Sequence, residues 1–319
     1  MRNVRYHLAL ALAALLAAGA GCAEVTPPEL PGGPPRVEKH ARILSLTPNV
    51  TEVLFAMGLG DDIVGRSTYC SYPPEAKAIP IVGDTLQVNQ EKIIKLNPTI
   101  AFAITRREDV PRALKKLGVR CVTLNSDTLP QLYESIRMIG RETDRADAAE
   151  ALIRRLETDL NAVRRRVALL KRPKVLFAFP MTIGSVQMMV AGRGTFVDGL
   201  LDAAGADNAY PDAADWPTVS PQKVIAMAPD IVIVNATGDD AAPDRIEAVR
   251  RAWANWTSVP AVRNGRVVIL TESYLTINGP RVGQAAARLA DVIHPPEPDA
   301  AAPAKPPAAP AAKPEEPAK

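Results

Sequence analysis

Residues 91–100 read EKIIKLNPTI, and residues 222–231 of the same chain read QKVIAMAPDI. Each stretch predicts a short helix, a turn that contains proline and the start of a buried strand. Asn89 and Ser220 lie two residues before Glu91 and Gln222, and both residue types favour helix N-caps. The chain therefore contains a repeated helix–turn–strand unit, and its two halves are expected to fold alike.

The repeat extends towards the N-terminus of each half. Residues 50–58 resemble residues 197–205, and each stretch predicts an apolar helix that ends at a glycine. The N-terminal half has about sixteen more residues between its two matching segments, and these fall around residues 67–74, STYCSYPP. A polar, aromatic and proline-rich insertion after a strand is typical of the ligand loops of α/β sheets.

Short β-rich runs alternate with helical segments through residues 41–294. They lack strict polar–apolar alternation, as strands buried on both faces do. The runs are residues 42–46, 100–104, 119–124, 175–179, 231–234 and 267–270. We therefore predict an α/β fold with two Rossmann-like lobes, each built on a parallel central sheet, at residues 41–142 and 172–294.

A long helix is predicted between the lobes, over residues 143–171. Apolar residues recur there at spacings of three and four, Thr143 or Asp144 can cap its start, and Pro173 follows its end. No glycine or proline interrupts the segment. About 28 residues at about 1.5 Å each span about 40 Å, and such a helix would brace the two lobes rigidly.

The two ends of the chain do not read as folded domains. Residues 1–22 have a basic start, a short apolar run and small residues, as in a secretory signal peptide. The run ends at Gly21-Cys22, which is typical of a bacterial lipoprotein with the lipid on Cys22. Ordinary cleavage after Ala20 is the alternative. Residues 23–40 are predicted to be a Pro/Gly-rich tether, and residues 295–319 a disordered Pro/Ala-rich tail.

Composition argues against several classes of function. The 319 residues carry a net charge of +3 with scattered Lys and Arg, so nucleic-acid binding is not expected. His7, His40 and His294 all lie outside or at the edge of the folded body, which argues against a histidine-based metal site or catalytic triad. No enzymatic activity, metal or cofactor is predicted. Cys70 and Cys121 either form a disulfide in an oxidising compartment or remain buried thiols.

Two α/β lobes joined by one long helix behind a lipoprotein signal resemble the single-helix (class III) substrate-binding proteins of ABC importers. The resemblance covers residues 41–294. The most specific stretches are residues 45–52, 67–74, 89–93, 215–220 and 279–281, and they are similar to the family members that bind cobalamin. Other members bind ferric siderophores or haem. The resemblance implies an extracytoplasmic protein that delivers a corrinoid or iron chelate to an ABC permease with its ATPase.

The resemblance and the residue types together suggest which side chains hold the ligand. Tyr69 lies in the insertion, and Trp216 lies in a polar loop of a chain poor in aromatic residues, so each could offer a ring to a flat ligand. Core packing is the alternative for both. Arg281 follows Pro280 at the expected start of a helix, where it could meet an anionic group or turn into solvent. Tyr274 and Asn49 are further candidates, and Asn49 could equally cap a helix.

Part of the cobalamin pattern is missing. The cobalamin-binding members have tryptophans at positions that correspond to the neighbourhood of Thr85 and Ile104 in this chain. Because these tryptophans are absent here, a smaller or differently shaped ligand is an alternative. Haem would need Tyr69 as its iron ligand, because no histidine is expected in the cleft.

Docking to the permease is a second predicted function. The family uses one glutamate on each lobe tip. Glu91 matches the first, whereas Gln222 stands in place of the second, with Asp212 or Asp215 as substitutes. A helix-start carboxylate stabilised by the dipole is the alternative reading of Glu91. A lipoprotein that has lost transport is a third reading of the whole chain, and Gln222 is its support.

Overall fold

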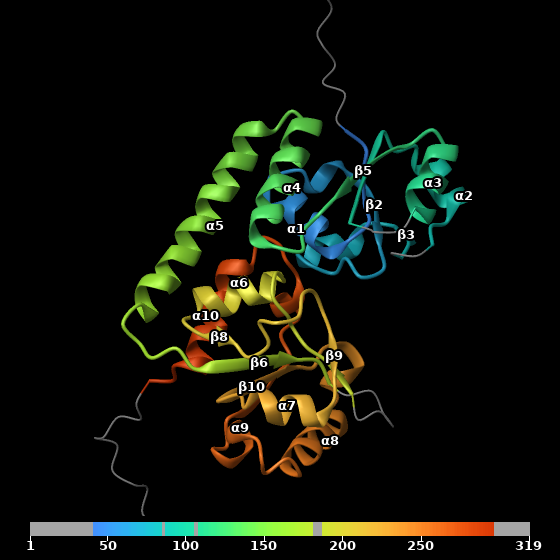
Figure 1. Ribbon diagram of the computed structural model, residues 1–319. Coiled ribbons are helices and arrows are strands. Elements are labelled where there is room, and N and C mark those ends of the chain that lie inside the picture. The colour runs from blue at the N-terminus through green and yellow to red at the C-terminus, as the bar shows by residue number, and fades with distance from the viewer. Residues whose placement is uncertain (1–40, 85–86, 105–107, 181–186, 297–319) are drawn as a thin grey trace, which may run out of the picture. The chain divides into compact units, whose positions relative to one another are not determined.

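The computed structural model describes residues 41–84, 87–104, 108–180 and 187–296. The N-terminal lobe contains a parallel five-stranded sheet in the order β3-β2-β1-β4-β5. Its strands are β1 (Ile43–Ser45), β2 (Ile63–Ser67), β3 (Ile81–Gly83), β4 (Ile100–Ile104) and β5 (Arg120–Leu124). Figure 1 shows this sheet with helices on both sides.

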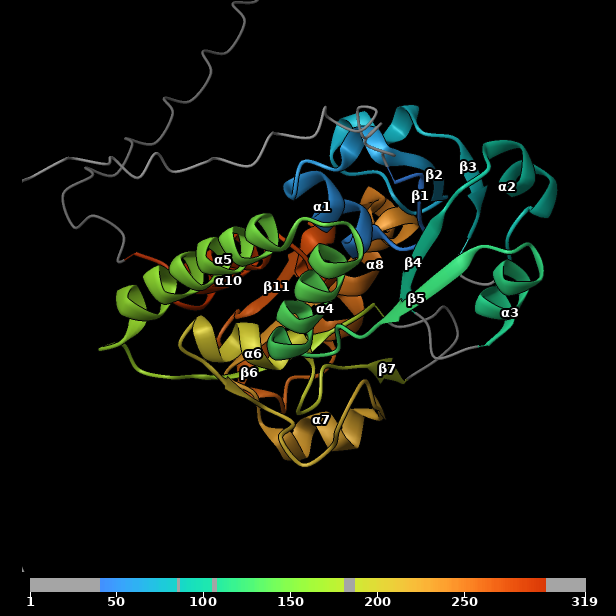
Figure 2. The same cartoon turned by 90° about the horizontal axis from the view of Figure 1, so that it is seen from above.

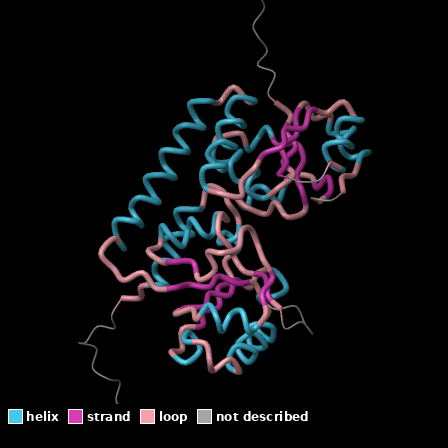
Figure 3. The backbone as a smooth tube through the Cα atoms, in the orientation of Figure 1, coloured by secondary structure: helices cyan, strands magenta, loops and turns pink. Residues whose placement is uncertain are grey.

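The C-terminal lobe has a second parallel sheet, in the order β11-β10-β6-β8. Its strands are β6 (Lys174–Ala178), β8 (Asp207–Asn208), β10 (Ile231–Asn235) and β11 (Val267–Leu270). A separate antiparallel pair joins β7 (Met188–Met189) to β9 (Thr218–Val219). The predicted α/β class with two parallel central sheets is confirmed (Figure 3).

The helices sort into three groups by the hydrophobic core that they bury. One core unites α1 (Pro48–Ala56), α4 (Leu129–Glu142), α5 (Ala146–Val167), α6 (Phe196–Ala203) and α10 (Val282–Ile293). A second lies under α2 (Gln90–Leu96) and α3 (Asp109–Lys116). The third lies under α7 (Pro221–Met227), α8 (Pro243–Ala254) and α9 (Pro260–Arg263). Further 3₁₀ turns lie at residues 60–62, 74–78, 238–241 and 273–276.

Alternate strand residues supply opposite faces of each sheet. Ile43 of β1 points into the first core and Leu44 into the second, while Phe177 and Leu176 of β6 divide likewise between the first and third cores. The first core therefore contains side chains from both sheets. One continuous apolar interior joins the lobes, so separating them exposes part of it to water and costs free energy.

Helix α5 is shorter than predicted. It runs over 22 residues, which corresponds to about 33 Å at the ordinary α-helical rise. It begins after a turn in which Asp144 has a φ of 54°. Its buried stripe packs on α4 and α10 (Figure 2). The helix ends at Val167 instead of running to Lys171, because the next large apolar residue, Leu169, is 99% exposed and has no core to meet.

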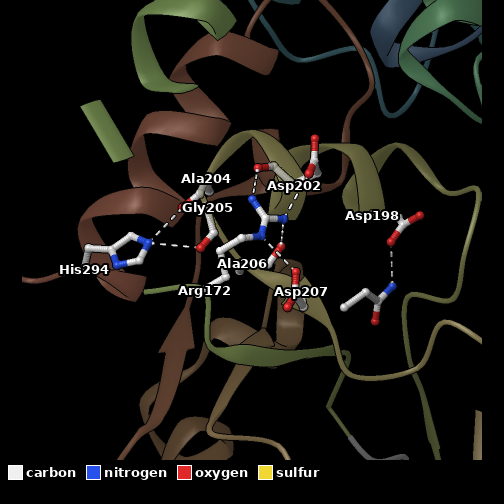
Figure 4. Close-up of polar contacts among 9 residues, drawn as sticks. Arg172, Asp198, Asp202, Ala204, Gly205, Ala206, Asp207 and His294 are labelled. Carbon is white, nitrogen blue, oxygen red and sulfur yellow. Dashed lines mark hydrogen bonds and ion pairs between the residues drawn. The ribbon is translucent and has the colours of Figure 1, made fainter. Parts of the chain in front are cut away.

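The C-terminal end of α6 is capped by side chains from other parts of the C-terminal lobe. Gly205 has a φ of 76°, the same value as its counterpart Gly58 after α1. Figure 4 shows the carbonyls at this end: His294 Nε2 donates to Ala204 O (3.2 Å) and Gly205 O (3.3 Å). Arg172 Nη2 donates to Ala206 O at 2.6 Å. Cationic or N–H-bearing side chains thus satisfy the carbonyls after the last helical turn.

The predicted signal peptide, Cys22, the tether and most of the tail lie outside the described residues. Within the described part of the chain, no helix is both long enough and apolar enough to cross a membrane.

Candidate functional site

The insertion after β2 presents two tyrosines to solvent. Tyr69 is 59% exposed and Tyr72 is 45% exposed. Between them, Cys70 is fully buried, and its thiol contacts Ser45 O (3.7 Å) and Ser67 Oγ (3.3 Å) at the ends of β1 and β2. The buried thiol fixes the loop to the sheet, so its aromatic rings are held outward at the carboxyl ends of the strands. This agrees with a ligand loop at that edge.

Arg281 lies in a different environment from the one that its position in the sequence suggested. It precedes α10, which begins at Val282 instead of Pro280. Its Nε and Nη2 donate to the two carboxylate oxygens of Glu52 on α1, at 2.9 and 2.5 Å. Its guanidinium also lies 4.0 Å from the ring centroid of Tyr72 and 5.3 Å from that of Tyr274. Arg281 is therefore paired with a carboxylate of the other lobe, and its contact with a ligand stays a prediction.

Glu52 is the residue that sequence reasoning missed. Its side chain is 2% exposed and that of Arg281 is 14% exposed, so the pair is buried between the lobes. Burial raises the pKa of the Glu52 carboxyl above its ordinary value, and the hydrogen bond and charge of Arg281 lower it by less. A carboxylate within the apolar run of residues 50–56 was a visible signal, because such a residue must find a buried partner.

Asn49 forms a second connection between the lobes. Its side-chain amide donates to Ser126 Oγ (3.0 Å) and to Asn278 O (3.3 Å). Asn278 in turn donates to Thr128 O at 3.0 Å. The N-cap position of α1 is Thr47, so the capping alternative for Asn49 was wrong. Asn49 instead ties α1 to the loop before α10 and to the loop before α4.

Trp216 belongs to another aromatic group. Its ring centroid lies 5.5 Å from that of Phe179 and 6.2 Å from that of Phe196 at the start of α6. The side chain is half-buried, so one part packs on its own lobe while the rest is accessible. The structure thus brings Tyr72 and Tyr274 to Arg281, whereas the printed ring contacts of Trp216 are with Phe179 and Phe196.

Of the two further positions of the cobalamin pattern, only the one at Ile104 lies within the described residues. Ile104 ends β4 and lines a groove of about 340 Å³ with residues of β5, α4 and the loop between them. Thr85 lies outside the described residues.

The permease-docking candidates both occupy first turns of short helices. Glu91 is exposed on α2, and Gln222 is exposed at the equivalent place on α7. Asp212 and Asp215 are exposed in the loop before β9. The predicted caps are confirmed, since Asn89 Oδ1 accepts from Lys92 N–H (2.9 Å) and Ser220 Oγ from Lys223 N–H (3.4 Å).

Cys70 and Cys121 are both free thiols, so the disulfide alternative does not match the structure. Cys121 lies on β5 opposite Ala101 of β4, whereas Cys70 is bonded at the end of β1. Strand β4 lies between β1 and β5. Two ordinary strand spacings amount to about 10 Å, whereas a disulfide needs Cα atoms within about 7 Å.

Both thiols are expected to react slowly in the native protein. Burial raises the pKa of the Cys121 thiol to about 11, which leaves very little thiolate near neutral pH. Cys70 is fully buried. A Cys22→Ser variant should therefore bind almost no thiol reagent when native and two equivalents in guanidinium chloride without reductant. No reaction in guanidinium chloride would demonstrate a disulfide.

Comparison with known proteins identifies the family to which this chain belongs. A family model described as "Periplasmic binding protein" matches residues 43–274. The chain belongs to that family. A relative from Bacillus subtilis, named an uncharacterized ABC transporter substrate-binding lipoprotein YvrC, is 29% identical over 80% of each chain. The vitamin B12-binding protein of Pectobacterium carotovorum is 26% identical over 78% of this chain and 86% of its own.

Solved structures show the same fold. The periplasmic heme-binding protein RhuT from Roseiflexus sp. RS-1, in apo form, has a TM-score of 0.67 and 30% identity over 79% of this chain and 97% of its own. This periplasmic binding protein therefore has the class III architecture, and its relatives are extracytoplasmic binding proteins of ABC importers.

Proposed function

We propose that this periplasmic binding protein captures cobalamin or a related corrinoid between its two lobes and delivers it to an ABC permease with its ATPase. The observation that carries the proposal is the pair of exposed tyrosine rings held outward by buried Cys70. Aromatic rings bind the apolar faces of flat macrocycles, and exposing two of them to water is unfavourable. Similarity to vitamin B12-binding proteins supports the corrinoid.

Capture is proposed to require little closure of the lobes. The continuous core, the Glu52–Arg281 pair and the bonds of Asn49 all join the lobes before any ligand is present. A surface organised in advance avoids the entropic cost of ordering loops on binding. The ligand would meet Tyr69 from the N-terminal lobe, Trp216 from the C-terminal lobe, and Tyr274 beside Arg281. Release would then follow docking, when the permease separates the lobes.

Haem or a ferric siderophore is the alternative ligand. The 59% exposure of Tyr69 leaves its phenol oxygen accessible to an iron atom, and phenol oxygen is an established haem ligand. His294, the one histidine within residues 41–296, is bonded to the end of α6. The similarity to a heme-binding protein supports this second candidate.

Equilibrium titration distinguishes these ligands. The full chain is titrated with cyanocobalamin, haemin and a ferric hydroxamate, with tryptophan fluorescence as the signal. We expect saturable, one-to-one quenching by cyanocobalamin at the lowest concentration of the three. Tighter binding of haemin would assign the alternative, and no saturable binding of any of the three would refute both.

Attachment to a membrane through a lipid on Cys22 is part of the proposal, and so is a location in the periplasm or on the cell surface. Cys22 lies outside the described residues, and the lipoprotein relative supports its role. Cys22→Ser is expected to move the protein from the membrane fraction to the soluble fraction, since a single residue carries the lipid. Unchanged membrane association of the variant would contradict the anchor.

A further inference from the structure

Helices α2 and α7 are two copies of one structural unit. Each has seven residues, each begins at a side-chain cap, and each ends at a residue in the left-handed conformation. These end residues are Asn97, with a φ of 43°, and Ala228, with a φ of 47°. The same turn leads into β4 in one lobe and into β10 in the other. Side chains at matching positions therefore have matching orientations relative to their own lobes.

Both units expose an isoleucine at the same position. Ile94 is 63% exposed and Ile225 is 41% exposed. In each helix the preceding residue, Ile93 or Val224, is fully buried and fixes the orientation of the helix on its sheet. The isoleucine, one residue and about 100° further round, is thereby turned to solvent. A single exposed apolar residue is ordinary on a protein surface. An exposed isoleucine at the same position in both copies of a repeat whose sequences have diverged indicates a shared role.

The isoleucines share a helix face with the docking candidates. Glu91 and Ile94 are three residues apart, as are Gln222 and Ile225, so each pair lies on one side of its helix. A further apolar side chain flanks each helix. Ile81 is exposed beside α2, and Met189 is exposed on the strand paired with β9, which leads into α7.

The lysine that follows each docking candidate is directed away from this face. Lys92 Nζ donates to Ile81 O at 3.1 Å. Lys223 Nζ lies 4.8 Å from the ring centroid of Tyr210. In each unit the lysine after the docking residue is thus directed onto its own lobe, and its charge is kept from the isoleucine.

We propose that Ile94 and Ile225 are apolar anchors by which the two lobes dock on the ABC permease. This inference rests on the proposed function and concerns its partner. Two equivalent aliphatic anchors, one on each lobe, fit a partner with two equivalent apolar depressions at its extracytoplasmic surface. The anchors also explain how the lobe with Gln222 docks without a carboxylate, because burial of Ile225 does not depend on charge.

The test uses Ile94→Ser and Ile225→Ser in the full chain, with Leu169→Ser as the matched control. Leu169 is 99% exposed on the turn after α5, outside α2 and α7. Affinity is measured for the partner ABC permease with its ATPase in lipid nanodiscs. Each isoleucine variant is expected to bind about tenfold more weakly than the wild type, and the control to bind unchanged. Cyanocobalamin affinity and the melting temperature should stay at wild-type values.

Ile225→Thr, which keeps the β-branched shape, provides a second variant if Ile225→Ser unfolds. Wild-type affinity of the folded isoleucine variants for the permease overturns the inference while the proposed function stands. Absence of permease binding by the wild-type chain overturns both. Sedimentation that shows a dimer of the wild type, lost in the isoleucine variants, would assign the anchors to a second copy of the chain and overturn the inference.

Discussion

Glu52→Ala is expected to lower the free energy of unfolding by about 3–5 kcal/mol at neutral pH. The substitution leaves the guanidinium of Arg281 buried without its carboxylate, and it opens a space between α1 and the loop before α10. Urea unfolding monitored by circular dichroism measures the change. The raised pKa of Glu52 indicates that Arg281 does not fully offset the cost of burying the carboxylate. The expected loss therefore comes from leaving the guanidinium of Arg281 buried and unpaired.

The matched control is Glu272→Ala, which breaks the more exposed pair of Glu272 with Arg288. That substitution should cost less than about 1 kcal/mol, because water solvates the remaining charge. A double variant, Glu52→Ala with Arg281→Met, should regain part of the stability lost by the single variant. Equal losses from Glu52→Ala and Glu272→Ala would show that the buried pair does not hold the lobes together.

Tyr69→Ala is expected to weaken ligand binding by at least tenfold. The ring is 59% exposed. Its removal should therefore leave the fold intact and remove a direct contact with the ligand. Affinity for cyanocobalamin and for haemin is measured by equilibrium titration. Trp216 is a less direct probe, because its ring packs against Phe179 and Phe196. Replacing Trp216 would therefore disturb the packing of its own lobe as well as any contact with the ligand.

Tyr69→Phe is the matched control, and it distinguishes the two candidate ligands. It keeps the ring and removes the oxygen. Corrinoid binding through the ring face should survive this substitution, whereas haem binding through the phenol oxygen should fall as it does in the alanine variant. If Tyr69→Ala binds both ligands as the wild type does, the insertion is not the ligand loop.

Local features of the fold were predictable from sequence. The caps at Asn89 and Ser220 depend on hydrogen bonds to residues three positions away, and the pattern of the repeat indicated both. The strands seen as apolar runs were also confirmed. Strand β2 was missed because Gly65 and Arg66 interrupt its apolar character, although both are buried in the structure. The paired strands β7 and β9, with two residues each, are too short to produce a pattern.

The contacts between the lobes were not predictable in the same way. Arg281 and Glu52 are 229 positions apart, as are Asn49 and Asn278. Nothing in the sequence around Arg281 reveals whether its partner is a ligand or a distant carboxylate. The same limit applies to Trp216, whose neighbours Phe179 and Phe196 come from other segments of the chain. Residue type indicated that these side chains needed partners, and the fold determined which partners they have.

Hydrogen–deuterium exchange with and without saturating ligand tests the central claim most directly, with cyanocobalamin and haemin as separate ligands. The central claim is that both lobes contribute to one ligand site. We expect slower exchange in residues 67–74 of the N-terminal lobe together with residues 211–217 and 272–281 of the C-terminal lobe. Helix α5 should exchange as before. Protection confined to one lobe, or none with either ligand, would contradict the account.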